Sequence, residues 1–551
     1  MPQSQGSGSR KLVTEKIVCL YEQLFKGENL WKNNPNFWDE FFLVWPNVEH
    51  LAAMFQRFQP NQVFQFKPLV QEIFLQSVLV IRDQANIRSV NAMQTICGLL
   101  YGCATFCGGQ EFGFNSVELL MGLSQAEKLM QIIVERLNHF LVEDFPTSLK
   151  VFSLRTLNTI ASIVDSVSRN TLLEYLMINS VFEAINKILA CPALRNPYGH
   201  EAVILLTLLV NYRKYENVNP YIVKLSILDD ELALNGYNQV ISYTLCDYNS
   251  MMQEKADAGN SSGGFLSTIT NMVGSMLVAN DAPIHCVKRD ETVLMALYEA
   301  VHLNRNFITT LTNIPAEANG TTPYHSEVKS AVEGTEIPLG QSHGSTTNLL
   351  VAFLTYCSVV MQDLKTERNQ EAAKLCMVIL TCISEDQYAN TLMHDNNMAF
   401  RVPLYRAPMR HRRAGFDKQN CPSRPLACAV LDLMLEFMLS HLMKNLPINL
   451  YMRAVGVIHR ILCYEKKCRV RLSYTWRELF NALAILLKYL VSQEPTLSAK
   501  FDIFLLSEKV VSVLNLFITY GDSFLPKARD YDELYYELIR NADTFEGLYA
   551  A

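Results

Sequence analysis

Apolar residues recur every three or four positions along most of the chain, which is the spacing of one face of an α-helix. Runs of alternating β-branched residues between hairpin dipeptides, which indicate strands, are nearly absent. Breakers punctuate the helical pattern at Gly108-Gly109, Pro146, Asn170, Pro192 and Pro197. The predicted helices span residues 11–26, 37–58, 69–82, 87–105, 124–141, 148–167, 171–190, 200–214, 230–255, 289–313, 349–364, 371–383, 428–446, 450–464, 474–491, 497–520 and 531–548.

This succession of helices without strands predicts an all-α fold. No fixed internal repeat period is visible, so we expect an armadillo- or HEAT-like α-solenoid with degenerate repeats and one long disordered insertion. A chain of 551 residues is too long for one hydrophobic core, which also favours an extended stack.

Three segments interrupt the pattern and define the predicted domains. Residues 1–10 read as a disordered N-terminus, and residues 256–264 as a flexible tether. Residues 314–348 are rich in Pro, Gly, Ser, Thr and Glu and poor in bulky apolar side chains, which predicts a disordered insertion. The insertion separates an N-terminal helical-repeat block, 11–313, from a C-terminal block, 349–551.

The tether leads to residues 265–279, predicted to be an amphipathic helix with no charged residue. Its other face holds only small, uncharged residues, a composition typical of helices that insert into loosely packed, curved membranes. A helix buried inside a solenoid has the same composition. The tether before it and the break at 280–283 favour the membrane interpretation, since a punctuated helix detaches more easily. The candidate membrane contacts are Phe265, Leu266, Ile269, Met272, Val273, Met276 and Leu277.

Residues 400–425 form a predicted basic loop, because interspersed prolines exclude a regular helix. Seven basic residues against the single acid Asp417 give a local charge of +6. Such a loop suits an anionic membrane leaflet or an acidic protein partner, but a solvated loop with arginines tied to helix C-termini is equally compatible. A smaller basic group at 466–471 has the same ambiguity. The candidates for anionic lipid or an acidic partner are Arg401, Arg406, Arg410, Arg412 and Arg413.

Residues 202–231 are the densest apolar patch of the N-terminal half. The nearly unbroken apolar run 202–210 predicts a helix that is buried on both sides. The polar residues 211–216 that follow either bind a partner or, as we favour, form a solvated helix end with cations near its C-terminus.

Composition narrows the function classes. The formal net charge of −6 gives no basic field for DNA or RNA. The 14 scattered cysteines fit a reducing cytosol better than a disulfide framework. The N-terminus has no signal-peptide core. The longest charge-poor apolar runs, 349–361 and 510–520, fall short of the ~20 residues of a spanning helix, so we expect any membrane contact to be peripheral.

Motifs for catalysis are missing from the sequence. There is no phosphate-binding glycine loop, nucleophile elbow, HExxH or kinase signature. The acidic pairs Asp229-Asp230 and Glu385-Asp386 are explained by N-capping. We therefore expect no enzyme, no cofactor and no small-molecule substrate. Two cysteine groups lack the paired CxxC spacing of a structural zinc site: Cys97, Cys103 and Cys107, and His459, Cys463 and Cys468.

Several long blocks resemble the armadillo-like helical domain-containing protein 3 family, and they occur in the family's order from about residue 11 to the end. Two departures stand out: residues 314–348 match poorly, and the chain stops after 546–549, where family chains continue into a further helical segment. The blocks are LLVNYRKYENVNPYIVKLS (208–226), TNMVGSM (270–276), LYEAVHLNRNFIT (297–309), SEDQYAN (384–390), PMRHR (408–412), CRVRLSYTWREL (468–479), FITYGDSFLP (517–526) and YDELYYE (531–537).

The resemblance implies a non-enzymatic adaptor in the cytoplasm and on the cytosolic face of the Golgi membrane, acting in Golgi maintenance and protein secretion. It implies two partners, a Golgi phosphatidylinositol 4-kinase of the beta class and a Golgi Arf guanine-nucleotide exchange factor. The alternative from the residues is a soluble armadillo-type cargo or transport receptor without direct lipid contact, and an enzyme of unknown chemistry comes third. The 265–279 helix discriminates, because a transport receptor has no use for a detachable uncharged helix.

Overall fold

The computed structural model describes residues 15–57, 65–109, 111–216, 218–261, 282–313, 348–406, 415–416, 421–442, 446–498 and 501–550. Residues 33, 257–261 and 282–290 are described by their backbone alone. The chain forms two compact units, one up to Gly236 and one from Tyr237 onward. The insertion predicted at 314–348 lies, except for Asn348, outside the described residues, so the separation of two blocks by it stays a prediction.

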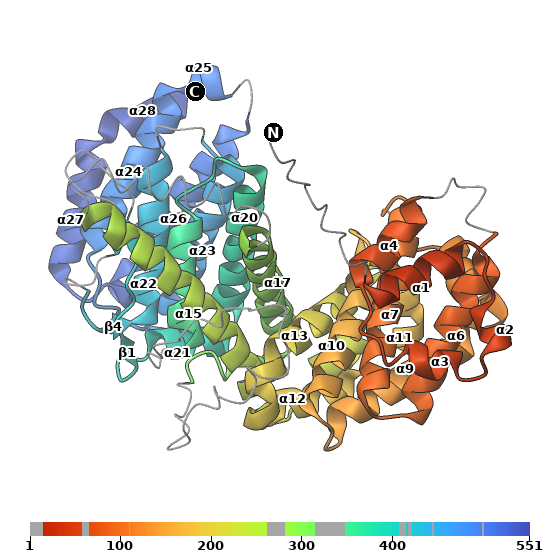
Figure 1. Cartoon of the computed structure of the whole chain (residues 1–551). Coiled ribbons are helices and arrows are strands. Elements are labelled where there is room, and N and C mark those ends of the chain that lie inside the picture. The colour runs from red at the N-terminus through yellow and green to blue at the C-terminus, as the bar shows by residue number, and fades with distance from the viewer. Residues whose placement is uncertain are drawn as a thin grey trace, which may run out of the picture. The chain divides into compact units, whose positions relative to one another are not determined.

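The first unit consists of helices (Figure 1). α15, Glu231–Ser261, begins in this unit and continues into the second. The other helices of the first unit are α1 Lys16–Phe25, α2 Leu30–Asn33, α3 Phe37–Phe41, α4 Val48–Gln56, α6 Lys67–Asp83, α7 Ile87–Phe106, α8 Phe114–Leu120, α9 Leu123–Val142, α10 Thr147–Ser162, the 3-10 turn η1 Val167–Arg169, α11 Leu172–Ile178, α12 Phe182–Ala190, α13 Pro192–Asn211 and α14 Pro220–Ser226.

The described residues of the second unit form helices and four two-residue strands. The strands are β1 Ala399–Phe400, β2 Tyr405–Arg406, β3 Gly415–Phe416 and β4 Arg424–Pro425. The helices are α17 Ala282–Leu303, α18 Arg305–Ile308, α19 Leu349–Val360, α20 Glu367–Glu385, α21 Gln387–His394, α22 Leu426–His441, α23 Ile448–Cys468, α24 Trp476–Ser492, α25 Glu494–Leu497, α26 Ile503–Phe524, α27 Ala528–Arg540 and α28 Ala542–Ala550.

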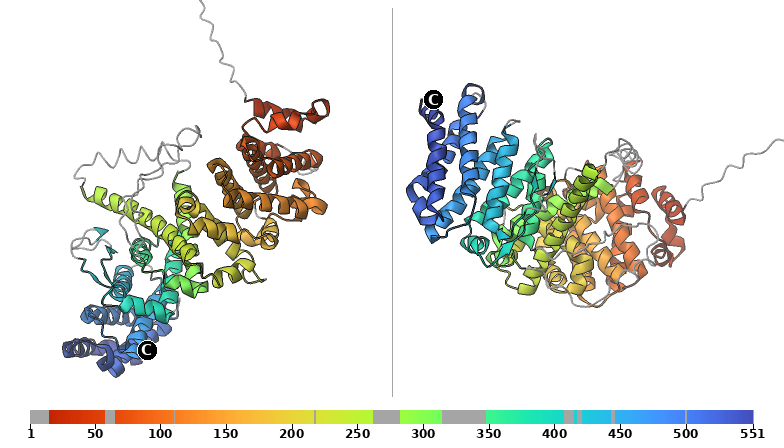
Figure 2. Two further views of the ribbon diagram at one scale, coloured as in Figure 1. Left: turned by 90° about the horizontal axis from the view of Figure 1, so that it is seen from below. Right: turned by 90° about the vertical axis from the view of Figure 1, so that its left-hand side faces the viewer.

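Each unit stacks its helices in two layers. In the first unit α4, α7, α10 and α13 follow one another in one layer, and α6, α9 and α12 in the other. In the second unit α17, α20, α23 and α26 form one layer and α19, α22, α24 and α27 the other, and Figure 2 shows the blue helices of this stack side by side. Helices of opposite layers pair, as in α12 with α13 and α22 with α23. This is an α-solenoid, and it confirms the predicted fold class.

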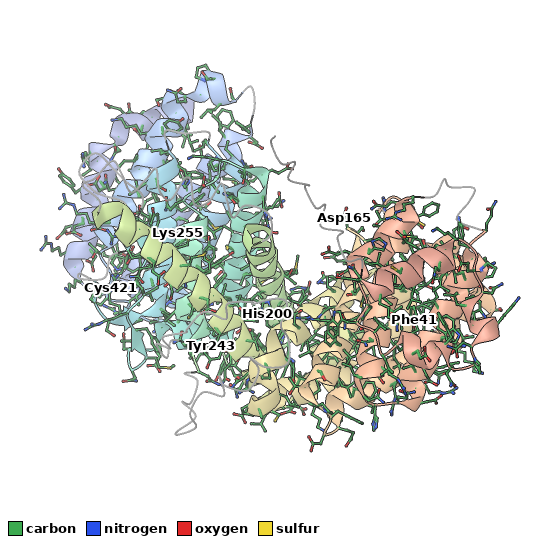
Figure 3. The ribbon with its side chains drawn as sticks, viewed as in Figure 1. Phe41, Asp165, His200, Tyr243, Lys255 and Cys421 are labelled. Atoms are coloured by element: carbon green, nitrogen blue, oxygen red, sulfur yellow. The ribbon has the colours of Figure 1, made fainter. Side chains whose placement is uncertain are left out.

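Apolar residues of the predicted kind fill the space between the layers. α13 buries Ala202, Val203, Leu205, Leu206, Leu209 and Val210, which confirms the helix buried on both sides. Near the N-terminus, where the helices are short, aromatic rings make up much of the core. Phe41, labelled in Figure 3, contacts the rings of Tyr21, Phe37, Trp38 and Phe42.

Polar side chains begin many of the helices. Asp230 Oδ1 accepts from the backbone N–H of Leu232 at 2.9 Å, and Asp386 Oδ1 accepts from that of Ala389 at 2.8 Å. Both contacts confirm the predicted N-caps. Glu385, by contrast, ends α20 and binds Arg460 of α23 at 2.7 Å.

Some predicted boundaries were wrong. Pro197 lies inside α13, because a proline there removes only the hydrogen bond to the carbonyl of Ala193. α15 continues to Ser261, into the predicted tether 256–264, where Ala256 and Ala258 are strong helix formers. The single helices predicted at 37–58, 171–190, 497–520 and 531–548 are each interrupted, and α8, α14 and α21 were missed.

Candidate interaction surfaces

The basic loop 400–425 is built on two short antiparallel strand pairs. β1 pairs with β4, with Ala399 opposite Pro425, and β2 pairs with β3, with Tyr405 opposite Phe416. The prolines excluded a regular helix, but parts of the loop form short strands. Residues 407–414, which join β2 to β3 and contain Arg410, Arg412 and Arg413, lie outside the described residues.

Side-chain contacts fix the base of this loop to the solenoid. The backbone N–H of Tyr405 donates to Ser358 Oγ on α19 at 2.8 Å, and the Tyr405 ring packs edge-on against Phe416 with centroids 5.3 Å apart. The thiol of Cys421, labelled in Figure 3, donates to the carbonyl oxygen of Val402 at 3.2 Å. The Tyr405 end of the arginine-containing segment is thus held by α19, and the Phe416 end is held by its pairing with β2.

Arg424 has a structural role at the end of the loop. Its guanidinium pairs with Asp432 of α22, and the Tyr474 hydroxyl donates to the other carboxylate oxygen at 2.9 Å. Burial, together with the Asp432 charge, raises the pKa of Tyr474, which keeps this hydroxyl a donor. Of the loop's other described arginines, Arg401 is exposed and Arg406 is half-buried. Arg401 therefore remains a candidate for an anionic ligand.

The smaller basic group at 466–471 is partly structural as well. Arg471 donates to the carbonyl oxygens of Leu525 and Asp522 at 3.2 and 3.1 Å, at the C-terminus of α26. The Lys466 ammonium lies 3.3 Å from the ring centroid of Tyr520. Lys467 and Arg469 are exposed. Two of these four cations thus join α23 and the chain that follows it to α26.

The predicted membrane-contact helix, residues 265–279, lies outside the described residues, as do its candidates Phe265, Leu266, Ile269, Met272, Val273, Met276 and Leu277. The chain is described up to Ser261 and again from Ala282. The membrane assignment of this segment stays a prediction.

One described helix, α26, is long and apolar enough to cross a membrane, and 39% of its apolar window is buried. The mean hydropathy of this window is 1.5, and the helix packs on α23 and α24. Leu506, Val510, Val513 and Phe517 are buried there, whereas Glu508 and Lys509 are exposed. We assign α26 to the solenoid core, since its insertion into lipid would strip the apolar faces of both neighbours.

Several apolar side chains on α14 and in segments close to it in the sequence are exposed, which no sequence pattern predicted. Arg213 adopts a left-handed backbone with φ of 43° and pairs with Glu174 at 2.8 Å, while Tyr215 is 90% exposed. The favoured interpretation of 211–216 as a purely solvated end is thus incomplete. The signal for α14 was the Asn219-Pro220 cap. The exposed apolar residues are Ile178, Tyr215, Val218, Val223, Ile227 and Leu232.

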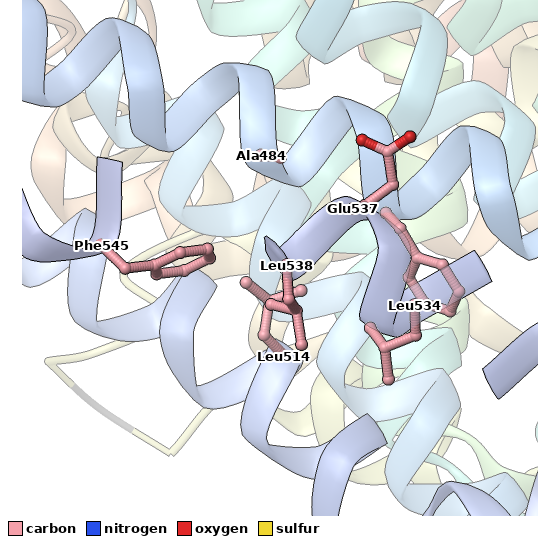
Figure 4. A pocket seen from close by; sticks show the side chains of 7 residues that line it. Ala484, Leu514, Leu534, Glu537, Leu538 and Phe545 are labelled. Carbon is pink, nitrogen blue, oxygen red and sulfur yellow. The ribbon is translucent and has the colours of Figure 1, made fainter. Parts of the chain in front are cut away.

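A small pocket of about 10 Å³ lies between α24, α26, α27 and α28 (Figure 4). Phe480, Leu514, Leu534 and Phe545 are among its lining residues. Sites for drug-sized ligands usually have volumes of roughly 300–1,000 Å³, so this space is a packing gap between helices. Among the described residues, no three His, Cys, Asp or Glu side chains are grouped to hold a metal ion.

A buried acid–base pair lies between α21 and α23. His394 Nε2 is 3.5 Å from Glu465 Oε1, and both side chains are almost fully buried. Burial raises the pKa of Glu465, and the His394 contact only partly opposes this. The folded protein therefore holds the Glu465 proton more tightly than the unfolded chain.

We predict that Glu465→Gln makes the protein more stable at pH 8 by about 1–2 kcal/mol, with a smaller gain at pH 5. A raised folded-state pKa contributes stability that is fully present below the unfolded pKa of about 4.3 and is lost as pH rises through the folded pKa. Urea unfolding at both pH values measures the difference. Glu385→Gln, at an exposed ion pair, is the control and should change stability little at either pH. A loss of stability in Glu465→Gln at pH 8 would contradict the prediction.

Comparisons with known proteins agree with this architecture. Residues 424–551 match the family described as "Armadillo-like helical domain-containing protein 3, C-terminal". Proteins named armadillo-like helical domain-containing protein 3 are 47% identical in Xenopus laevis and in Homo sapiens, over 99% of this chain and 81% of each relative. A protein of Schizosaccharomyces pombe described as a "UPF0588 membrane protein" is 20% identical over 97% of this chain and 83% of its own length. The chain therefore belongs to the armadillo-like helical domain-containing protein 3 family.

Proposed function

We propose that this protein is a non-enzymatic scaffold that works at the cytosolic face of the Golgi membrane. The observation that carries the proposal is the fixed base of the basic loop. Two strand pairs and the Tyr405–Ser358 contact anchor the two ends of the segment that contains Arg410, Arg412 and Arg413. The chain has a net charge of −6, yet these three arginines are close together in the sequence and their segment is anchored at both ends. Such a group of cations suits an anionic lipid surface, for example one that contains phosphatidylinositol 4-phosphate.

A second contact with lipid is proposed for residues 265–279, whose apolar face would insert between lipids while the arginines meet headgroups. Two weak signals are sufficient together where one is not, because each adds to the same binding free energy. The relative from Schizosaccharomyces pombe is described as a membrane protein, which supports the proposal of a membrane contact.

The partners that we propose are a Golgi phosphatidylinositol 4-kinase of the beta class and a Golgi Arf guanine-nucleotide exchange factor, on the resemblance described above. The two-layer solenoid offers long helical surfaces for such proteins. The exposed apolar side chains near α14, including Val223 and Ile227, are the surface that we propose for one of them. A soluble cargo or transport receptor without lipid contact remains the alternative function.

Flotation of the purified protein with vesicles tests the membrane part. We predict that Arg410→Glu, Arg412→Glu and Arg413→Glu together weaken binding to vesicles containing phosphatidylinositol 4-phosphate at least ~100-fold, since each lost cation contributes ~1 kcal/mol. Ile269→Asp or Met272→Asp should abolish the preference for small over large vesicles.

The control carries the same charge change at exposed sites away from the loop, namely Arg57→Glu, Lys374→Glu and Arg529→Glu. It should bind vesicles like the wild type. If the loop variant and this control behave alike, the basic loop is only a solvated segment. If the wild type does not float at all, this result favours the alternative function of a soluble cargo or transport receptor.

A binding experiment with the purified kinase and exchange factor tests the proposed partners. The wild type should bind them, and the double variant Val223→Asp with Ile227→Asp should lose binding of one of them.

A further inference from the structure

Two cysteines and a serine meet where α7 ends against α8. Cys103 is buried on the last turn of α7, and Cys107, the C-cap residue directly after this helix, is exposed. The Ser116 hydroxyl of α8 donates to Cys107 Sγ at 3.1 Å, and the Cys103 thiol lies 3.6 Å from the carbonyl oxygen of Ser116. The spacing of four residues places both sulfurs on the same side of α7.

The hydrogen bonds around Cys107 favour its thiolate. The Cys103 thiol, which shares its one hydrogen between Cys107 Sγ and the Ser116 carbonyl oxygen, and the Ser116 hydroxyl both donate toward Cys107 Sγ. Together they outweigh burial and lower the pKa of Cys107 to about 6. The C-terminal end of α7 opposes this effect, because its backbone carbonyls carry partial negative charge. The two donors are therefore what distinguishes Cys107 from an ordinary cysteine at a helix end.

Cys107 is exposed, and two glycines follow it. Gly108 and Gly109 have φ of 83° and 69°, and a side chain at either would meet no atom within 4 Å. The Cα atoms of residues four apart on a helix are about 6.2 Å apart, which lies within the range that disulfides span. Because Cys107 is the C-cap residue just beyond α7 and two left-handed glycines follow it, its backbone can shift and bring its Cβ closer to Cys103 while the interior of α7 stays in place.

We propose that Cys103 and Cys107 form a hydroperoxide-reactive dithiol, in which Cys107 is the residue attacked and Cys103 resolves the product to a disulfide. The Cys107 thiolate attacks the terminal oxygen of a hydroperoxide, the O–O bond breaks, and the alcohol or water leaves with a proton from solvent. The sulfur is oxidised to sulfenic acid and the peroxide is reduced. The Cys103 sulfur then attacks the Cys107 sulfur, the S–O bond breaks, and water leaves with the thiol proton.

Alkylation rates test the reactivity of Cys107. Iodoacetamide labelling of the intact protein between pH 5 and 9, read by mass spectrometry, should give a Cys107 rate that is half-maximal near pH 6. At pH 6 the rate should exceed that of free N-acetylcysteine by about tenfold, after allowing for the lower nucleophilicity of a thiolate of low pKa. Ser116→Ala should move the half-maximal pH upward while the thermal unfolding midpoint stays near that of the wild type.

Peroxide treatment tests the disulfide step. One equivalent of hydrogen peroxide should remove two hydrogens from the peptide that holds Cys103 and Cys107 in the wild type. Cys103→Ser should instead accumulate sulfenic acid at Cys107, trapped by dimedone. A Cys107 alkylation profile that coincides with that of N-acetylcysteine would overturn the proposal. Oxidation of wild-type Cys107 to sulfinic acid without a disulfide would overturn the role of Cys103.

Discussion

Replacement of Gly236 by alanine is expected to destabilise the first unit by about 3 kcal/mol, at the upper end of the usual cost of overpacking. A Cβ at residue 236 would lie 2.0 Å from the Leu189 carbonyl oxygen and 2.8 Å from its carbon. That oxygen already accepts a hydrogen bond of 2.6 Å from Arg195, so the end of α12 is held in place. Because the atoms nearest to the new Cβ belong to the backbone of Leu189, that backbone would have to move. A flexible side chain in the same place could rotate away instead. Thermal unfolding monitored by circular dichroism measures the loss.

Gly456→Ala is the matched control, because it makes the same change in the interior of α23. The nearest atom to its Cβ is Arg460 Nη1 at 2.9 Å, which is the end of a flexible side chain. We expect a change within about 1 kcal/mol in either direction, since alanine favours a helix over glycine by about that amount. Equal losses in both variants would show that the close approach of α15 to α12 does not limit stability.

These two glycines show what the sequence could and could not predict. Helical periodicity was enough to predict the fold class, because burial of one helix face follows from local spacing. In α9, within the predicted helix 124–141, Leu129, Ile133 and Leu137 are buried. The contact between Gly236 and Leu189 depends on how α15 crosses α12, and no local pattern encodes a crossing. The predicted start of α13 was wrong for a related reason. Pro197 weakens the helix locally, but the packing of residues such as Leu205 and Leu209 stabilises α13 more than one missing hydrogen bond destabilises it.

For the candidate interaction surfaces, too, the sequence predicted some features and could not predict others. Charge counting found the basic loop, but it could not separate Arg424, which Asp432 neutralises from α22, from the exposed Arg401. For Arg471 the alternative of an arginine tied to a helix C-terminus is the one the structure shows, since it binds the oxygens of Leu525 and Asp522 at the end of α26. The exposed residues near α14 were missed because an exposed apolar side chain looks like a core residue in sequence. Only the packed helices show which apolar positions lack a neighbour.

Replacement of Asn219 by alanine is expected to cost about 3–4 kcal/mol, since it removes a helix cap and leaves buried carbonyl groups without donors. Asn219 Nδ2 donates to the carbonyl oxygens of Leu209 at 2.8 Å and Tyr212 at 2.9 Å, at the end of α13. Its Oδ1 accepts from the N–H groups of Tyr221 at 2.8 Å and Ile222 at 3.3 Å, at the start of α14. Thermal unfolding gives the total loss, and hydrogen exchange of peptides from 209–226 should localise it.

Aspartate separates the two roles of Asn219, because it caps a helix as well as asparagine does but donates no hydrogen bond. We expect Asn219→Asp to be at least as destabilising as Asn219→Ala, since a buried carboxylate would face the carbonyl oxygens of α13. Asn86→Asp is the matched control: Asn86 caps α7 at an exposed site, accepting from Arg88 at 2.9 Å, and a negative charge there suits the helix N-terminus. It should change stability by less than about 0.5 kcal/mol. Wild-type stability in Asn219→Asp would mean that capping alone accounts for this residue, and that the carbonyl groups at the end of α13 find other donors.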